Sequence, residues 1–595
     1  MVTYSAPLDD IRFVMHELLD YETRVAALPG YEEATGELFD TVVEEAARFC
    51  TNEILPINRS GDEEGCTFEN GVVRTPAGFK EAYTAFAEGG WTGLACDPEF
   101  GGQGLPHCLQ FVIDELVCST NLSFGMYPGL SHGAYRALAL HGSDAQKQIY
   151  LPKLTDGTWS GTMCLTEPHC GTDLGLIRTK AEANGNGAYH ITGTKIFISA
   201  GEHDLTENIV HLVLAKLPDA PPGTKGISLF IVPKWLVKSD GGLGARNGVA
   251  CGSIEAKMGI KASATCVMNF DAAEGYLVGA PHSGMRTMFT MMNAARLAVG
   301  IQGLGLAETA YQSASAYAKE RLQGRALSGP QAADKPADPI IVHPDVRKTL
   351  LTMRAYVEGS RALALWAGMA VDIAERHPDA TARQEADDLL ALTTPIIKAL
   401  FTDLGFEVTN LGVQVFGGHG YIREWGMEQL VRDARIAQIY EGANGIQALD
   451  LVGRKLPYRT GRQLRRFFHP VQAFLEANQS DPALTEFIMP LAKAYGRLQQ
   501  ATAWIAQQGL RDPNEAGAAA SDYLRLFGLT ALAYMWAQTA KLAQDKTEGE
   551  NTDFYKAKLA TARFYMTRLL PQTSGLFAAI MAGAKPIMDP AEAWL

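Results

Sequence analysis

Apolar residues recur at helical spacing near the start of the chain. In GELFDTVVEEAARF (36–49), four apolar residues fall on one side of a helix and acidic residues fall on the other. The four apolar residues are Leu38, Val42, Ala46 and Phe49. We therefore expect a mainly helical domain over residues 1–160. The glycine-rich stretch DPEFGGQGLP (97–106) lacks the lysine of a phosphate-binding loop, so we interpret it as a connection.

The pattern changes near Gly161, where short β-branched and aromatic runs are separated by glycine. GAYHITGTKIFIS (187–199) and GISLFIVPKWLV (226–237) are runs of this type. ATCVMNFD (264–271) alternates between apolar and other positions, as a half-buried strand does. These runs predict a small antiparallel β domain over residues 161–283.

Helical periodicity returns after the predicted β domain. Residues 291–325 form one long candidate helix, and a Pro-rich loop (328–339) separates it from a second helix that begins near Asp345. Two further helices are expected at 382–416 and 427–440. Together these elements define a helical domain over 284–458. An Ala-rich tail, 459–595, predicts an appended bundle of about four helices.

Charge and cysteine content exclude several classes of protein. The chain has 595 residues, a net charge of −14 and nine cysteines. An acidic surface argues against nonspecific nucleic-acid binding. Without a C-x-x-C pair, we expect free thiols in a reducing cytosol and no metal site. The N-terminus shows no secretory signal, and we identify no uninterrupted apolar run of membrane-spanning length, so we expect a cytoplasmic protein with no membrane span.

One basic segment interrupts this acidic chain. GRKLPYRTGRQLRR (453–466) contains six lysines and arginines. We favour a solvated linker. A contact with a polyanion, such as a nucleotide phosphate, is the alternative.

Two glycine-bearing segments are candidates for ligand binding. In MCLTEPHCGTDLG (163–175), Thr166, Thr172 and the backbone of Gly171 have the polar groups to bind phosphate, although an ordinary turn has the same composition. In QVFGGHGYIREWG (414–426), the glycines permit close backbone approach to a ligand. His419 in this segment has no identifiable partner, and we interpret it as a loop residue.

A lone acid stands where the predicted helix 427–440 ends. In QIYEGANGIQ (438–447), Glu441 follows apolar residues. Desolvation and the helix dipole would both raise its pKa toward that of a useful base. A solvent-facing glutamate that merely ends a helix is the alternative, and the local pattern alone favours it.

Six segments, in order, resemble motifs of the acyl-CoA dehydrogenase family over about residues 35–455. MCLTEPHCGTD resembles the flavin segment TEPxAGSD, and KIFIS occupies the place of K-x-WIT. KMGIKASAT is similar to MGxRxSxT, and YAKERLQGR to YAxERxxFG. QVFGGHGY and RDARIAQIYEGANGIQ resemble QxxGGxGY and RDxxxxxIYEGTxxIQ.

The resemblance implies a mainly α fold with a helical domain, a β domain and a four-helix domain, here followed by an appended C-terminal helical bundle. It implies FAD as cofactor and Glu441 as catalytic base. Cofactor contacts are implied for Met163, Leu165, Thr166, Gly171, Thr172, Phe197, Ser199, Arg321, Gln323, Gln414, Gly417, Gly418, Ala443 and Asn444. In the family, the positions of Arg321, Gln323 and 414–418 reach the cofactor of a neighbouring subunit. Substrate contacts are implied for Thr172, Asn293, Arg296 and Gly442.

Three residues depart from the family pattern. Phe197 replaces a tryptophan that stacks near the flavin, and Ser199 replaces a threonine but keeps its hydroxyl. Ala443 replaces the threonine of YEGT, so that contact is either absent or supplied by Asn444 or by backbone. We also expect Gly442 to turn the chain and Asn444 to cap the next helix.

The implied reaction is α,β-dehydrogenation of an acyl-CoA to the trans-2-enoyl-CoA, with electron-transferring flavoprotein as the usual acceptor. The C-terminal bundle and the opening YSAPLDDIRFVMHEL (4–18) resemble a bacterial subfamily of about this length whose substrates include 3-methylthiopropanoyl-CoA. Cofactor contacts across an interface imply a homodimer, which we favour over a tetramer. Two alternatives are an acyl-CoA oxidase and a non-catalytic helical binding protein with the same fold.

Overall fold

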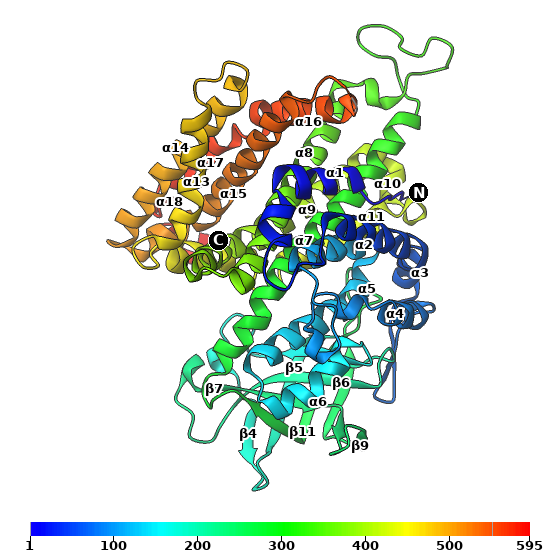
Figure 1. Ribbon diagram of the computed structural model, residues 1–595, viewed down its shortest axis with the longest axis vertical. Coiled ribbons are helices and arrows are strands. Elements are labelled where there is room, and N and C mark those ends of the chain that lie inside the picture. The colour runs from blue at the N-terminus through cyan, green and yellow to red at the C-terminus, as the bar shows by residue number, and fades with distance from the viewer. Residues whose placement is uncertain (1, 550, 595) are drawn as a thin grey trace. The chain divides into compact units, whose positions relative to one another are not determined.

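The computed structural model describes residues 2–549 and 551–594 and divides into two compact units (Figure 1). Unit 1 comprises Met1–Ala47, Pro106–Ser119 and Val299–Leu595. Unit 2 comprises Arg48–Leu105 and Thr120–Ala298. Three helices have residues in both units: α2 (Gly36–Phe49), α5 (His107–His141) and α7 (Gly284–Glu320).

Unit 2 is built around a seven-stranded sheet. Its strands are β3 (Trp159–Cys164), β4 (Lys180–Ala183), β5 (Tyr189–Ser199), β6 (Asn208–Lys216), β7 (Ile227–Pro233), β10 (Val249–Ile254) and β11 (Thr265–Val278). The order is β10-β11-β5-β4-β6-β3, and β7 pairs with both β11 and β6. Smaller elements are α3 (Pro56–Glu64), α4 (Phe79–Glu88), α6 (Asp144–Thr155), β1 (Thr67–Glu69), β2 (Val72–Arg74), β8 (Trp235–Val237) and β9 (Leu243–Arg246).

The central strands of this sheet are buried on both faces. Every residue of β7 is buried, and so are all but the last of β6. On β6, Leu212 and Leu214 pack into one hydrophobic cluster, whereas Val213 packs into a second cluster. Residues of α6, including Leu151 and Leu154, belong to the first cluster. The alternation of side chains along each strand therefore divides the core of unit 2 into two layers.

Unit 1 is helical. Its helices are α1 (Leu8–Arg12), α8 (Pro344–Arg376), α9 (Ala380–Phe416), α10 (Gly418–Tyr421), α11 (Met427–Arg435) and α12 (Asn444–Asp450). The C-terminal part adds α13 (Arg462–Asn478), α14 (Thr485–Gly509), α15 (Pro513–Gln544), α16 (Thr552–Phe564), α17 (Gln572–Met581) and α18 (Lys585–Met588). Figure 1 shows the long helices of this part lying together as a bundle.

The C-terminal bundle packs on the preceding core helices through α15. Trp536 on α15 donates its indole N–H to the carbonyl of Ala355 on α8 at 3.1 Å. Gly528 on α15 lies against Leu400 on α9, where an added Cβ would come within 2.6 Å of the leucine side chain. Bundle and core therefore share one packed interior within unit 1.

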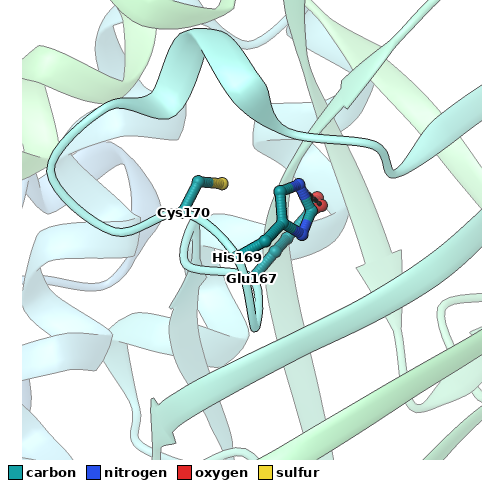
Figure 2. A group of neighbouring side chains, drawn as sticks. All are labelled: Glu167, His169 and Cys170. Atoms are coloured by element: carbon teal, nitrogen blue, oxygen red, sulfur yellow. Dashed lines mark ion pairs between the residues drawn. The ribbon is translucent and has the colours of Figure 1, made fainter.

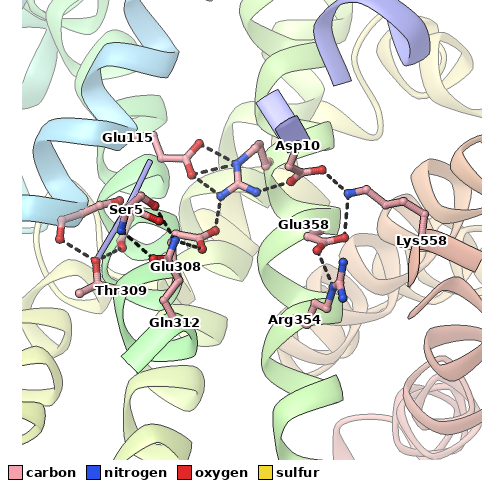
Figure 3. Close-up of polar contacts among 12 residues, drawn as sticks. Ser5, Asp10, Glu115, Glu308, Thr309, Gln312, Arg354, Glu358 and Lys558 are labelled. Carbon is pink, nitrogen blue, oxygen red and sulfur yellow. Dashed lines mark hydrogen bonds and ion pairs between the residues drawn. The ribbon is translucent and has the colours of Figure 1, made fainter. Parts of the chain in front are cut away.

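A buried charge network connects segments that are far apart in the sequence of unit 1 (Figure 3). Arg361 on α8 binds Glu115 on α5 through Nη2 at 2.6 Å, and it also binds Asp10 on α1 and Glu308 on α7. Burial opposes its charge, but the three carboxylates hold the pKa of Arg361 well above its usual value.

The network extends into the C-terminal bundle through a lysine. Lys558 on α16 binds Asp10, and it binds Glu358 on α8 at 2.8 Å. Glu358 also accepts from Nε of Arg354 at 2.6 Å. Because breaking a buried pair leaves a charge without compensation, each member depends on the others.

Several predicted elements are confirmed and several need correction. The helices predicted at 36–49 and 382–416 form, as do the predicted strands. In α2, however, the buried side chains are Phe39, Val43, Ala46 and Ala47, because neighbouring segments cover a face rotated from the one predicted. The sheet is also not purely antiparallel, since β6 runs parallel to β3 and β4.

Two helix ends also differ from the prediction. The long helix predicted to reach residue 325 ends at Glu320, and the helix predicted over 427–440 ends at Arg435. Among the described residues, α9 alone is long and apolar enough to cross a membrane by length and composition. Polar residues interrupt its apolar sequence, and 72% of its apolar window is buried inside the protein.

Removing Lys558 should destabilise unit 1 far more than removing a surface lysine. We expect Lys558→Met to lower the free energy of unfolding by about 3 kcal/mol or more, because Asp10 and Glu358 lose a buried countercharge. Urea unfolding followed by circular dichroism measures the effect.

Lys546→Met is the matched control. Lys546 also joins the bundle to the N-terminal segment, through Glu17 at 2.8 Å, but its side chain is 44% exposed. We expect a loss of less than about 1 kcal/mol. Equal losses for the two variants would contradict a structural role for the network.

Candidate active site

The turn at Glu441 has a strained backbone. A 3-10 turn, Ile436–Gln438, follows α11, and α12 begins at Asn444. Glu441 has φ 56° and Gly442 has φ 88°, both in the left-handed region. Left-handed backbone costs a residue other than glycine about 1–2 kcal/mol, so surrounding contacts must stabilise this conformation at Glu441. The expectation that Gly442 turns the chain is confirmed. The half-buried carboxylate stands beyond the α-helix rather than on its last turn.

The turn is anchored on both sides. Oδ1 of Asp403 on α9 accepts from Nε2 of Gln438, before the turn, at 2.7 Å. The same oxygen accepts from Nδ2 of Asn444, after the turn, at 2.7 Å. The buried Gln447 donates to the carbonyls of Glu441 at 3.3 Å and Gly442 at 3.1 Å. These contacts fix the backbone that carries the carboxylate.

Asn444 does not cap α12, contrary to the prediction. Its side-chain oxygen accepts from Nζ of the buried Lys398 at 2.8 Å, and its side-chain nitrogen donates to Asp403 and Thr402. Ala443 occupies the N-cap position, with no side-chain cap. The Asn444 side chain is therefore bound to α9, and the flavin contact expected of the hydroxyl missing at Ala443 is either absent or made by backbone.

Tyr440 connects this turn to α7. Its hydroxyl donates to Oε1 of Gln302. Burial raises the pKa of Tyr440, and the negative charge of Glu441 raises it further. The residue that precedes Glu441 is thus a neutral phenol held within the helical core.

In unit 2, a second group of predicted residues follows β3. Met163 is half-buried on that strand, and Leu165 is buried. The carbonyl of Thr166 accepts from the backbone N–H of Ile196 on β5 at 2.9 Å. The exposed residues Gly171 and Thr172 come next in the chain. The predicted flavin segment therefore lies along β5.

Phe197 has an unusual position on β5. Its φ is 57°, and its side chain is 60% exposed. The pairing of β5 with β11 shifts register between Cys266 and Met268, opposite this residue. A bulge of this kind re-aims a side chain, and an exposed aromatic ring on strained backbone is suited to stacking on a ligand. Ser199, half-buried at the end of β5, pairs with Thr265.

A buried ion pair that sequence reasoning missed holds the flavin segment in place. Nζ of Lys195 binds Oε1 of Glu167 at 2.8 Å and the carbonyl of Leu165 at 2.9 Å. Glu167 also accepts from the Thr179 hydroxyl at 2.6 Å and the Arg178 N–H at 2.7 Å. Burial would raise the pKa of Glu167, but Lys195 and these donors lower it below its usual value. Glu167 lies 28 positions before Lys195, so the local pattern of KIFIS gave no sign of this partner.

Glu167, His169 and Cys170 have potential metal-ligand atoms within 4.8 Å of one another (Figure 2). The cysteine pattern of the sequence predicts no metal site. Nε2 of His169 lies 2.9 Å from the carbonyl of Leu176 and 3.7 Å from Oε2 of Glu167. Because the Glu167 carboxylate already binds Lys195 and other donors, we interpret the group as part of the ion-pair cluster.

Arg321 and Gln323 lie at the start of an exposed loop after α7. The loop is organised by Asp338, which accepts from the backbone N–H groups of Ala326, Gln331 and Ala332. These bonds, led by that of Ala326, outweigh burial and lower the pKa of Asp338 far below its usual value. These hydrogen bonds order the loop that carries Arg321 and Gln323.

Gln414, Gly417 and Gly418 are exposed where α9 ends and α10 begins. Gly417 has φ 60° and ψ −135°, a conformation that favours glycine. His419 has a partner, contrary to the sequence interpretation. Its Nδ1 lies 2.9 Å from the Tyr317 hydroxyl, and its ring stacks on Trp425 with centroids 4.5 Å apart. Tyr317 lies 102 positions before His419, so local spacing in the sequence could not identify it as the partner.

Asn293 and Arg296 are one helical turn apart on α7, within unit 2. Asn293 is exposed and Arg296 is buried. Nη1 of Arg296 lies 3.5 Å from Oδ1 of Asn293, and the guanidinium lies over the ring of Phe289. The Asn293 amide and the Arg296 guanidinium therefore lie close together on α7, where one ligand could contact both.

Family models match most of the chain. "Acyl-CoA dehydrogenase, N-terminal domain" matches residues 38–158, and "Acyl-CoA dehydrogenase, middle domain" matches 162–273. "Acyl-CoA dehydrogenase, C-terminal domain" matches 282–456. A fourth model, "Acetyl-CoA dehydrogenase C-terminal like", matches residues 467–590 in the appended bundle.

Individual proteins resemble the chain over nearly its full length. It is 45% identical to 3-methylmercaptopropionyl-CoA dehydrogenase from Ruegeria pomeroyi, covering 96% of this chain and 97% of the relative. Caenorhabditis elegans ACDH-11 in complex with C11-CoA aligns with a TM-score of 0.77 at 19% identity, covering 95% and 91% of the two chains. An acyl-CoA dehydrogenase complexed with FAD from Bacillus anthracis aligns with a TM-score of 0.73 at 21% identity, covering 95% and 89%. At these identities the two structures show a shared fold.

Replacing Asp403 should loosen the turn at Glu441. In Asp403→Ala, Gln438 and Asn444 lose their common acceptor, so we expect faster amide hydrogen exchange over residues 438–447 and a stability loss of about 1–2 kcal/mol. Asp387→Ala removes an exposed acid from the same helix and should leave exchange in the turn unchanged. Unchanged exchange in Asp403→Ala would show that the anchor does not hold the turn.

Proposed function

Because the chain belongs to the acyl-CoA dehydrogenase family, we propose that it carries out FAD-dependent α,β-dehydrogenation of an acyl-CoA thioester, with Glu441 as the base for the α-proton. The observation that supports this role is the Glu441 turn. A carboxylate is held on left-handed backbone by Asp403, on both sides of the turn, and by Gln447. Maintaining a strained acid at this point is expected of a catalytic group.

The residues of unit 2 fit a flavin. Phe197 offers a ring that is largely exposed on strained backbone, and Ser199 offers a hydroxyl two residues further along the strand. We propose that both bind the flavin, together with Met163, Leu165, Thr166, Gly171 and Thr172. In unit 1 we propose cofactor contacts for Arg321, Gln323, Gln414, Gly417, Gly418, Ala443 and the backbone of Asn444. When bound, the flavin supplies the acceptor for the hydride that leaves the substrate β-carbon.

The protein's part in the reaction is proton transfer and positioning. The Glu441 carboxylate accepts the α-proton, which is weakly acidic beside a thioester. Donors to the thioester oxygen stabilise the charge that develops there, and we propose the Glu441 backbone N–H as one of them. Burial and the negative charge of Glu441 raise the pKa of Tyr440, so this neighbour stays a neutral phenol and adds no charge beside the proposed base. Thr172, Asn293, Arg296 and Gly442 are the proposed contacts to the acyl-CoA.

The substrate we propose is 3-methylthiopropanoyl-CoA, on the basis of the relative that is 45% identical. We propose electron-transferring flavoprotein as the acceptor, a homodimer as the assembly and the cytoplasm as the location. The domains we propose are residues 1–160, 161–283, 284–458 and 459–595, and the ranges matched by the family models support them.

Anaerobic flavin bleaching with a panel of acyl-CoAs tests this proposal. We expect the purified protein to carry FAD and to bleach fastest with 3-methylthiopropanoyl-CoA. Pentanoyl-CoA is the matched control because it replaces the sulfur with a methylene. This near-isosteric exchange is expected to change kcat/KM by less than the ~10- to 200-fold that adding or removing a methylene causes. A colourless protein that takes up no FAD would contradict the proposed activity. Faster bleaching with pentanoyl-CoA would contradict the substrate, and stoichiometric peroxide release in air would identify an oxidase.

A further inference from the structure

Unit 1 contains a cavity of about 770 Å³ that the proposed reaction does not use. Its walls come from the N-terminal segment, the end of α8, the start of α9, and α13 of the appended bundle. None of the residues proposed to bind the cofactor or the acyl-CoA lines it. Its volume is within the range of small-molecule sites.

The cavity is basic in an acidic protein. Among the described residues, Arg24, Arg465 and Arg466 line it together with a single acid, Glu385. The arginines therefore leave a surplus of two positive charges, to which His377 and His469 add when protonated. The chain as a whole carries a net charge of −14. A local surplus of this sign attracts an anion.

The arginines retain hydrogen-bonding capacity. Nη1 of Arg466 binds Glu385 at 2.5 Å, but its Nε is buried and has no hydrogen-bond partner among the described residues. Arg465 donates from Nη1 to the carbonyl of Thr460 at 2.8 Å, which uses one of its five N–H groups. Arg24 is exposed. Guanidinium groups with remaining donors are suited to bidentate binding of phosphate oxygens.

The rest of the wall is mainly apolar. Leu28, Trp366 and Leu389 are buried and line the cavity, and alanines, prolines, Ile373 and Thr23 complete the surface. Trp366 offers an aromatic ring near the charged groups. A ligand that fits both features has an anionic head and an apolar or planar body.

We propose that this cavity is a second ligand site, which binds a phosphorylated small molecule of nucleotide size. Its phosphate binds Arg465, Arg466 and Arg24, and its body packs on Trp366 and the apolar wall. The surplus of two charges matches a phosphate dianion better than a monocarboxylate. The basic segment 453–466 thus contributes its last two arginines to a binding site rather than serving only as a solvated linker.

Binding of ADP to the full-length protein, measured by isothermal titration calorimetry, tests the proposal. We expect Arg465→Gln and Arg24→Gln each to weaken binding about 10-fold or more, since each removes a charge-assisted hydrogen bond. Both side chains are exposed, so the variants should fold, and thermal unfolding checks this. Arg459→Gln removes an exposed arginine from the same segment outside the cavity and should bind ADP as the wild type does.

Two further measurements distinguish the cavity from the proposed acyl-CoA site and from a carboxylate site. Asn293→Ala should leave the ADP affinity unchanged, because Asn293 is a proposed acyl-CoA contact and does not line the cavity. Octanoate is the carboxylate probe, and we expect it to bind more weakly than ADP. No ADP binding at millimolar concentration, equal affinity in all the arginine variants, or tighter binding of octanoate would each overturn the proposal.

Discussion

Unit 1 depends on one buried arginine. Arg361 is 1% exposed and binds carboxylates from α1, α5 and α7. These three residues, Asp10, Glu115 and Glu308, lie more than a hundred positions from one another in the sequence. Taking these charges out of water is costly, and their attraction offsets that cost only when every partner is present. The network therefore favours a single arrangement of these helices, and Lys558 brings the appended bundle into it.

The same unit carries the proposed catalytic turn, and its contacts show how a rigid scaffold supports local strain. Asp403 belongs to α9, a largely buried helix against which α15 of the bundle packs. By binding Gln438 and Asn444, it joins the two sides of the turn at Glu441. Strain at one residue persists because the helix that opposes it is itself fixed. In unit 2, the buried ion pair of Glu167 and Lys195 likewise holds the segment beside Phe197 in place.

The sequence predicted what depends on local periodicity. Helices and strands were predicted from spacing within one segment, whereas Glu441, Phe197 and Ser199 were predicted as site residues from the resemblance of their motifs to a known family. Contacts between distant residues were not predictable in this way. The partner of His419 lies on another helix, and the partners of Asn444 lie on α9, so neither could be identified from the local pattern. The left-handed backbone at Phe197 depends on a register shift in the sheet, which no single strand encodes.

The role of Glu441 is the central claim, and anaerobic bleaching of the bound flavin by 3-methylthiopropanoyl-CoA tests it most directly. Wild-type protein should bleach more slowly when both α-hydrogens of the substrate are deuterium. Glu441→Gln should keep its FAD and bind the acyl-CoA, because the amide is nearly isosteric, yet bleach about 100- to 10,000-fold more slowly, as expected when a general base is lost. Bleaching of Glu441→Gln at close to the wild-type rate would show that another group takes the proton.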